Sequence, residues 1–380
     1  MLKFFARKKS KKDSLMAEEG YRKSAHFHPL VVSDIVKETK DTVSVAFELS
    51  PEREAEYTFE PGQYLTLKAQ INGEEVRRSY SICSSPLDGE LRVAIKQVEN
   101  GLFSTYANTE LRVGDSLEVM TPMGNFTAPI KEGQKKKYVA FAAGSGITPV
   151  MSLVKSVLEI EKESTFVLFY GNQTSKTVIF KEAFEDLKDQ YLNRLEIHHV
   201  LSREDQGTDY LKGRIDADKV NVFASKFFEA KSVDHFFICG PEGMINATKD
   251  TLATLGVDSQ NIHFELFAPA TPPKKKETKE VDSKKTEVLS QVTVVLDGEE
   301  THFEVSSKGK TILDAALDAG ADVPYACKGA VCCTCRAKII EGSAEMEMNY
   351  ALVDEEVNDG YVLTCQSHPT AEKVVVSFDE

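Results

Sequence analysis

The chain has 380 residues, of which 41% are hydrophobic and 28% are charged, and its formal net charge is −14. This length is enough for two or three domains with separate cores. The negative charge argues against non-specific binding to nucleic acid, and no apolar run is long enough to form a transmembrane helix. Five of the seven cysteines lie in the last 54 residues, and no signal peptide is recognisable. We therefore expect a cytoplasmic protein with a local cysteine-based site rather than a secreted disulfide framework.

The sequence pattern changes along the chain. Residues 1–26 begin with the basic stretch MLKFFARKKSKK, which we expect to be a flexible tail. From 27 to 132, short apolar runs rich in β-branched residues are separated by Gly, Pro, Asp and Asn, which predicts an antiparallel β-barrel or sandwich. From 133 to 267, strands such as YVAFAA and TFVLFY alternate with helical stretches. That alternation predicts an α/β domain whose parallel sheet has helices on both faces.

The last part of the chain begins after a polar stretch. Residues 268–290 contain APATPPKKKETKEVDSKKTE, which has little to bury and predicts an extended linker. Residues 291–380 carry six Lys or Arg against seventeen Asp or Glu, a net charge of −11. This asymmetry indicates a docking surface for a basic partner, or a solvated face that only aids solubility. A predicted hairpin, helix and C-terminal strand indicate an α+β domain.

Within this acidic segment, Cys327, Cys332 and Cys335 share one loop, and Cys365 follows later. The spacing C-x4-C-x2-C with a distant fourth cysteine is the plant-type ligand set of a [2Fe–2S] cluster. Four thiolates also suit a structural zinc ion, but zinc sites usually present two short C-x2-C pairs. Three cysteines crowded into one loop favour iron and sulfur, with Cys333 as a spectator. The segment resembles plant-type ferredoxin domains, which implies a β-grasp fold.

A second motif, Arg78-Ser-Tyr80-Ser81, lies on a predicted strand of the N-terminal segment. It is similar to the R-x-Y-S flavin motif of the ferredoxin–NADP reductase family, which implies an FAD-binding barrel. The resemblance implies that Tyr80 stacks on the isoalloxazine and that Ser81 bonds near its reactive edge. Arg78 would pair with the pyrophosphate, whose oxygens suit a guanidinium fork. The same family completes the pyrophosphate site at a helix N-terminus, and the matching residues here are Gly101, Ser104 and Thr105.

The α/β segment carries two further motifs of that family. After the strand YVAFAA comes a turn of the form G-x-G-x-x-P, in which glycines allow a pyrophosphate to approach the backbone; its residues are Gly144, Gly146, Thr148 and Pro149. At the end of a later strand stands Cys239-Gly240-Pro241. In the family this segment borders the nicotinamide, and Cys239 would assist the approach of the hydride donor to the flavin.

The choice of nucleotide depends on Ser202 and Arg203, at the end of the third α/β strand. Members of the family that use NADP carry Ser-Arg there, and an arginine accommodates the 2′-phosphate. We therefore expect NADPH, whereas Glu204 and the replacement of a family arginine by Gln173 leave NADH as the alternative. Glu265 and Phe267 end the reductase module, and we expect both near the flavin. Ser81, Cys239 and Glu265 are the candidate catalytic residues.

This order of modules resembles the reductase components of multicomponent oxygenases. The resemblance implies electron transfer from NADPH to FAD, then to the [2Fe–2S] cluster, then to a separate oxygenase. The segment PYACKGAVCCTCRAKIIEG is most similar to the reductase subunits of ring-1,2-phenylacetyl-CoA epoxidases. Another di-iron hydroxylase or a fatty-acyl desaturase is the alternative acceptor. An iron–sulfur redox sensor is the non-enzymatic alternative, and a zinc-binding interaction module is a third. We expect no nucleic-acid partner.

Overall fold

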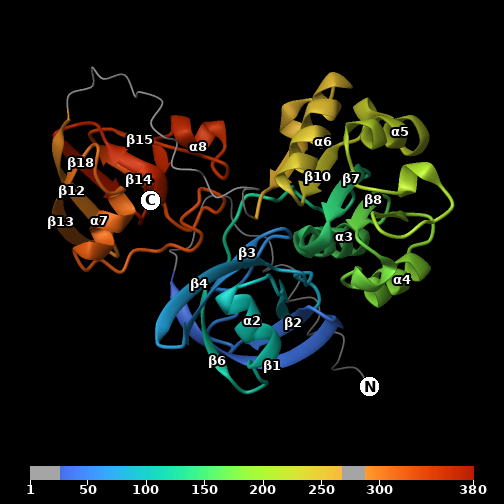
Figure 1. Ribbon diagram of the computed structural model, residues 1–380, viewed down its shortest axis with the longest axis horizontal. Helices are drawn as coiled ribbons and strands as arrows, with labels where there is room; N and C mark the ends of the chain where they lie inside the picture. Colours follow the sequence, from blue (N-terminus) through green and yellow to red (C-terminus); the bar gives the residue numbers. More distant parts are fainter. Residues whose placement is uncertain (1–25, 268–286) are drawn as a thin grey trace.

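The computed structural model describes residues 26–267 and 287–380, which form three lobes with one main sheet each (Figure 1). The predicted tail at 1–26, apart from its last residue, and most of the predicted linker at 268–290 lie outside the described residues. Within the described part, no helix combines the length and apolar character needed to cross a membrane.

The first lobe is a curled antiparallel sheet with the strand order β4-β3-β6-β1-β2-β5. Its inner face packs around a cluster of buried aliphatic and aromatic side chains, which one helix covers. The antiparallel barrel expected for the FAD domain is confirmed. Its elements are β1 Phe27–Thr39, β2 Thr42–Glu48, β3 Tyr64–Ile71, β4 Glu74–Ser81, β5 Leu91–Lys96, α2 Leu102–Thr109 and β6 Ser116–Met120.

The second lobe is a parallel sheet with the order β11-β10-β7-β8-β9. The order reverses between β7 and β10, so the crevice at the carboxyl ends of these strands is where such sheets bind ligands. Two helices pack on each face, α3 and α4 on one and α5 and α6 on the other, as the alternation predicts. The elements are β7 Lys137–Ala143, α3 Ile147–Ile160, β8 Thr165–Asn172, α4 Lys181–Gln190, β9 Leu195–Leu201, α5 Ala217–Phe227, β10 His235–Cys239, α6 Glu242–Thr254 and β11 Ile262–Glu265, with 3-10 turns η1 Gly144–Gly146, η2 Ser175–Thr177, η3 Asp209–Leu211, η4 Ala230–Ser232 and η5 Ser259–Asn261.

The third lobe is a mixed sheet with the order β13-β12-β18-β14-β16, beside a short β15-β17 pair. The β12–β13 hairpin, the parallel β12–β18 pairing and the helix packed across them form the expected β-grasp. Strand β12 begins at Leu289, inside the segment assigned to the linker. The elements are β12 Leu289–Leu296, β13 Glu299–Ser306, α7 Ile312–Asp318, β14 Arg336–Glu341, β15 Ala344–Met346, α8 Asp354–Asn358, β16 Tyr361–Leu363, η6 Thr364–Gln366, β17 Ser367–Pro369 and β18 Lys373–Ser377.

The three lobes meet at the loop that carries the clustered cysteines. Cys332 and Ala326 pack against Tyr64 of β3 in a small buried cluster. The neighbouring side chain of Val331 packs against the core of the second lobe. In Figure 1 the third lobe accordingly lies above β3 and β4 of the first. The fold thus places this loop beside the strand that ends with the R-x-Y-S motif.

Candidate functional site

The four predicted cluster ligands come together in two pairs. The Cys332 thiol lies 3.0 Å from the Cys327 sulfur, and the thiols of Cys335 and Cys365 are hydrogen-bonded to each other. The loop curls tightly because Lys328 and Ala330 adopt left-handed backbone conformations, with φ of 49° and 62°. Two pairs of thiols suit two iron ions with two cysteines each.

Backbone N–H groups converge on these sulfurs. The N–H of Gly329 donates to the Cys327 sulfur at 3.3 Å, and that of Ala330 donates to Cys365. The hydrogen bond from the Cys332 thiol, supported by backbone N–H donors, lowers the pKa of Cys327 to about 6. Backbone N–H groups that donate to the ligand sulfurs fit an iron–sulfur cluster, whose potential depends on such bonds.

The zinc alternative requires the ligands to surround one ion. The four thiols here are arranged as two pairs, Cys327 with Cys332 and Cys335 with Cys365, which fits two ions better than one. Cys333 directs its sulfur to the Ala351 carbonyl oxygen at 3.3 Å, which supports its assignment as a spectator.

The three candidate catalytic residues also lie together. Ser81 ends β4, and its Oγ is 3.3 Å from Oε2 of Glu265, 184 positions away in the chain. Cys239 and Glu265 are direct partners in the parallel pairing of β10 and β11. The carboxyl ends of these strands therefore meet the end of the R-x-Y-S strand.

The surroundings of these groups favour their protonated forms. Burial raises the pKa of Glu265 to about 8, although the hydroxyl of Ser81 opposes the shift. Burial, and secondarily the nearby Glu265 carboxyl, raises the pKa of Cys239 well above its ordinary value. At neutral pH this site therefore holds a thiol, a hydroxyl and a carboxylic acid. Such a neutral, partly enclosed site is suited to positioning a hydride donor and acceptor, and it can donate a proton from Glu265.

The other flavin-motif residues lie on β4 and on the helix beside it. The Tyr80 ring lies 5.6 Å from the Phe103 ring of α2, and Arg78 is exposed, with Nη1 donating to the Arg77 carbonyl at 2.7 Å. Gly101 is the N-cap of α2. The Ser104 hydroxyl bonds within that turn, accepting from the Val98 N–H at 3.2 Å and donating to the Gly101 carbonyl at 3.2 Å. Thr105 accepts a bond from Gln97.

The glycine turn of the second lobe is in close contact with the end of β10. A Cβ on Gly146 would lie 2.1 Å from the carbonyl oxygen of Cys239, so no larger residue fits there without backbone movement. Gly144 has φ +54°, and Thr148 donates to the Ser145 carbonyl in the first turn of α3, which also contains Pro149.

The neighbouring strand ends in a turn that leads into α6. Pro241 is the N-cap of α6, and Gly240 precedes it. A Cβ on Gly240 would lie 2.6 Å from the methyl carbon of Met244. The turns after β7 and β10 thus flank the crevice at the switch point.

The residues expected to select the nucleotide follow β9. Ser202 and Arg203 are exposed, and their backbone N–H groups donate to the carbonyls of Asn172 and Gln173. Glu204 accepts hydrogen bonds from the backbone N–H and hydroxyl of Ser175, at 2.8 and 2.9 Å. At the end of the module, Phe267 is 40% exposed.

Sequence reasoning missed the residues that join the lobes. Arg77 is 6% exposed. Its Nη2 lies 3.1 Å from Oδ1 of Asp322, and its guanidinium lies over the rings of Tyr325 and Phe27. Period-2 alternation along β4 places Arg77 and Arg78 on opposite faces, but no local signal indicates which of the two is covered by the third lobe.

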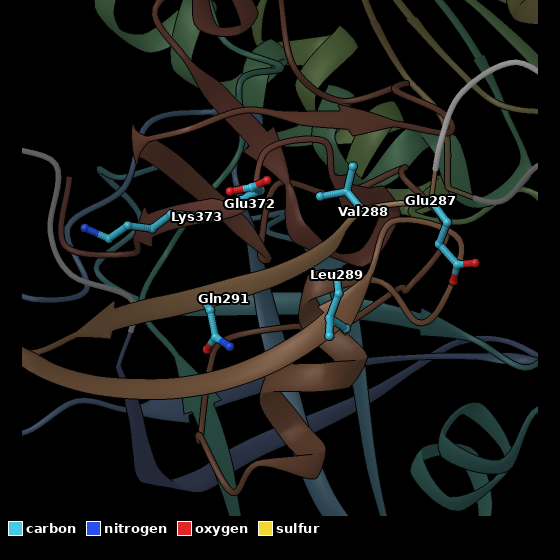
Figure 2. A pocket seen from close by; sticks show the side chains of 6 residues that line it. All are labelled: Glu287, Val288, Leu289, Gln291, Glu372 and Lys373. Carbon is cyan, nitrogen blue, oxygen red and sulfur yellow. The ribbon is translucent and has the colours of Figure 1, made fainter.

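A hollow beside the start of β12 in the third lobe includes none of these groups. Figure 2 shows its six side chains, which point in different directions from β12, from the residues just before it and from the start of β18. None of them is a predicted site residue; they are Glu287, Val288, Leu289, Gln291, Glu372 and Lys373.

Three domain families match the chain in the predicted order. They are described as oxidoreductase FAD-binding domain, oxidoreductase NAD-binding domain and 2Fe-2S iron-sulfur cluster binding domain, over residues 29–128, 141–250 and 294–370. The chain is 43% identical to one of the subunits of the 1,2-phenylacetyl-CoA epoxidase of Escherichia coli (strain K12), over 93% of this chain and 98% of that protein. It is 32% identical to the 3-ketosteroid-9-alpha-monooxygenase ferredoxin reductase component of Rhodococcus rhodochrous, over 92% and 96%. The chain belongs to this family of oxygenase reductases.

The reductase also has the fold of a solved relative. Phthalate dioxygenase reductase superposes with a TM-score of 0.56 at 23% identity, covering 92% of this chain and 98% of that one. The reductase is an oxidoreductase that uses a pyridine nucleotide, FAD and a [2Fe–2S] cluster and works with a separate oxygenase component. The predictions of fold class, cofactors, enzyme class and partner class are confirmed. The domain boundaries and the roles of individual residues stay predictions.

Proposed function

We propose that this reductase passes electrons from NADPH through FAD and the [2Fe–2S] cluster to an oxygenase of the phenylacetyl-CoA epoxidase type. The observation that carries the proposal is the 43% identity to a component of that epoxidase over 98% of its length. The match includes all three modules, so it extends to the acidic ferredoxin-like lobe that would meet the oxygenase.

The chain's own residues have positioning roles in this reaction. FAD, when bound, supplies the conversion of a two-electron hydride transfer into single-electron transfers. Tyr80 and Arg78 would hold its ring and pyrophosphate. Ser81, Cys239 and Glu265 would line the place where the nicotinamide meets the flavin, and the Ser81–Glu265 hydrogen bond would hold a proton there.

The nucleotide would bind across the turns after β7 and β10, where Gly144, Gly146, Gly240 and Pro241 lie beside one another. We assign the 2′-phosphate to Ser202 and Arg203. The Arg203 guanidinium, which can pair with a phosphate, supports NADPH, whereas the Glu204 carboxylate, which accepts hydrogen bonds from Ser175 and stays ionised, keeps NADH as the alternative. Steady-state kinetics with both nucleotides tests the preference, and a higher kcat/KM for NADH would reverse it.

The proposed domains are FAD-binding at 27–132, nucleotide-binding at 133–267 and ferredoxin-like at 291–380, with a linker between the last two. Cys327, Cys332, Cys335 and Cys365 are the proposed cluster ligands. A cytoplasmic location belongs to the same proposal, because none of the seven cysteines forms a disulfide and a reducing compartment keeps cysteines unpaired.

An anaerobic absorption spectrum before and after addition of NADPH tests the internal chain. Flavin and iron–sulfur bands that both bleach are the expected result. Bleaching of the flavin alone would show that the cluster is not reached internally, and a colourless, zinc-containing protein would contradict the proposal.

The acceptor is tested by reconstitution. The purified epoxidase oxygenase should be reduced and turn over with this reductase. The 32% identity to a 3-ketosteroid-9-alpha-monooxygenase component makes another hydroxylase the second candidate, and faster reduction of such an oxygenase would favour it.

A further inference from the structure

A chain of buried hydroxyl groups connects the cysteine loop to the flavin-motif strand. The backbone N–H of Cys333 donates to the Tyr64 hydroxyl at 3.1 Å. That hydroxyl lies 3.2 Å from Oγ1 of Thr334, which lies 3.3 Å from Oγ1 of Thr66. Thr66 in turn lies 3.1 Å from the Ser79 hydroxyl. The chain therefore runs from a residue between two cluster ligands to a residue between Arg78 and Tyr80.

The position of this chain on the sheet is informative. Tyr64 and Ser81 are direct cross-strand partners in the β3–β4 pairing, and so are Thr66 and Ser79. Directly opposed residues of an antiparallel pair project from the same face, with Cβ atoms roughly 5 Å apart. The hydroxyl of Tyr64 thus contacts the cysteine loop, while its neighbour across the strands is Ser81, which bonds to Glu265.

These polar groups are enclosed by the two lobes together. Tyr64, Thr66 and Thr334 are 4%, 1% and 1% exposed. Buried hydroxyls and N–H groups are costly unless they are paired, so the loop fits this face in one arrangement that satisfies them all. Two further contacts flank the chain: Arg77 to Asp322 on one side, and the Asn125 amide to Glu356 at 2.9 Å on the other.

We propose that the hydrogen-bonded hydroxyl chain of Tyr64, Thr334, Thr66 and Ser79 holds the cluster loop against the flavin motif. Tyr64 and Thr66 are then positioning residues for electron transfer from flavin to cluster. The inference rests on the proposed function. Each transfer moves one electron from reduced FAD to the oxidised cluster. The two electrons of one NADPH hydride supply two such transfers, and the cluster passes the first electron to the oxygenase before it accepts the second.

The test uses the holoprotein and variants that remove a hydroxyl with little change of shape, Tyr64→Phe and Thr66→Val. Tyr57→Phe is the matched control, because Tyr57 is also buried in the first lobe and donates a hydrogen bond to the Val119 carbonyl at 2.6 Å, away from the third lobe. Anaerobic stopped-flow with NADPH gives the rate of flavin reduction and the rate of cluster reduction. We expect the rate of cluster reduction, divided by the rate of flavin reduction, to fall about tenfold in Tyr64→Phe and to stay at the wild-type value in Tyr57→Phe.

Hydrogen–deuterium exchange supplies a readout that does not depend on turnover. Loss of the hydroxyl chain should speed hydrogen exchange at the Cys333 N–H and in the peptide around it, residues 326–336, by about tenfold. A role limited to barrel stability would instead speed exchange along the strands of the first lobe.

The proposal would be overturned if both Tyr64→Phe and Thr66→Val left the ratio of reduction rates and the exchange protection of the loop unchanged. Failure of the proposed function has a different signature, because NADPH would then leave the flavin and cluster of the wild-type protein oxidised. The exchange measurement would still decide whether the hydroxyl chain holds the loop in place.

Discussion

The Glu265 carboxyl provides a sharp test of the site, because its pKa of about 8 lies far above the ordinary value of 4.5. A carboxyl whose pKa is raised on folding keeps its proton in the folded state while the unfolded chain loses it. The stability that it contributes is therefore fully present at low pH, declines as pH rises from about 4.5 to about 8, and then stays constant.

The size of the effect follows from the shift. At about 1.4 kcal/mol per pKa unit, the whole shift corresponds to roughly 5 kcal/mol, of which about 3 kcal/mol is lost between about pH 6 and about pH 9. Part of Glu265 is exposed, so these values are upper limits and we expect about 1–3 kcal/mol over that interval.

The perturbation is Glu265→Gln, which keeps the shape and the hydrogen-bonding capacity but cannot ionise. Urea unfolding at about pH 6 and about pH 9, monitored through the release of flavin, measures the difference in the free energy of unfolding from wild type. We expect the free energy of unfolding of the variant, relative to that of wild type, to increase by about 1–3 kcal/mol from the lower to the higher pH. Glu99→Gln, which removes an exposed carboxyl, is the control and should show a constant difference. A Glu265→Gln difference that is equally constant would refute the assignment of a protonated carboxyl beside Ser81.

Three further results are expected. Gly146→Ala should destabilise the second lobe by several kcal/mol, measured by thermal unfolding, because its Cβ would lie 2.1 Å from the Cys239 carbonyl oxygen; an unchanged transition would show that the turn can move. Cys335→Ser should remove the iron–sulfur absorption, whereas Cys333→Ser should keep it. The opposite result would show that Cys333 is the ligand and Cys335 is not. Shortening the linker at 268–290 should slow reduction of the oxygenase more than internal cluster reduction, whereas unchanged turnover would count against movement of the third lobe.

Local patterns were sufficient for the cofactors and for the architecture. The C-x4-C-x2-C spacing, the R-x-Y-S strand and the glycine turn are short segments whose chemistry is set by neighbouring residues. The alternation of strands and helices fixed the parallel sheet for the same reason, since each βαβ unit is local in sequence. Even the start of β12 at Leu289 differs from the predicted boundary by only two residues.

Contacts between distant segments could not be predicted in this way. The sequence identified Ser81 and Glu265 separately, but it is the parallel pairing of β10 with β11 and the packing of the lobes that bring them to 3.3 Å. The raised pKa of Glu265 is likewise a consequence of burial, which no motif specifies.

By itself, the sequence determined which groups this protein carries: the four proposed cysteine ligands, the R-x-Y-S motif and the glycine turns. Only the tertiary structure decided how they face one another. Along β3, alternation places Tyr64 and Thr66 on the face opposite Leu65 and Leu67, yet all four are buried, because the barrel core covers one face and the third lobe covers the other. A strand's period sets the direction of each side chain, whereas the surface that it meets depends on residues 270 positions away.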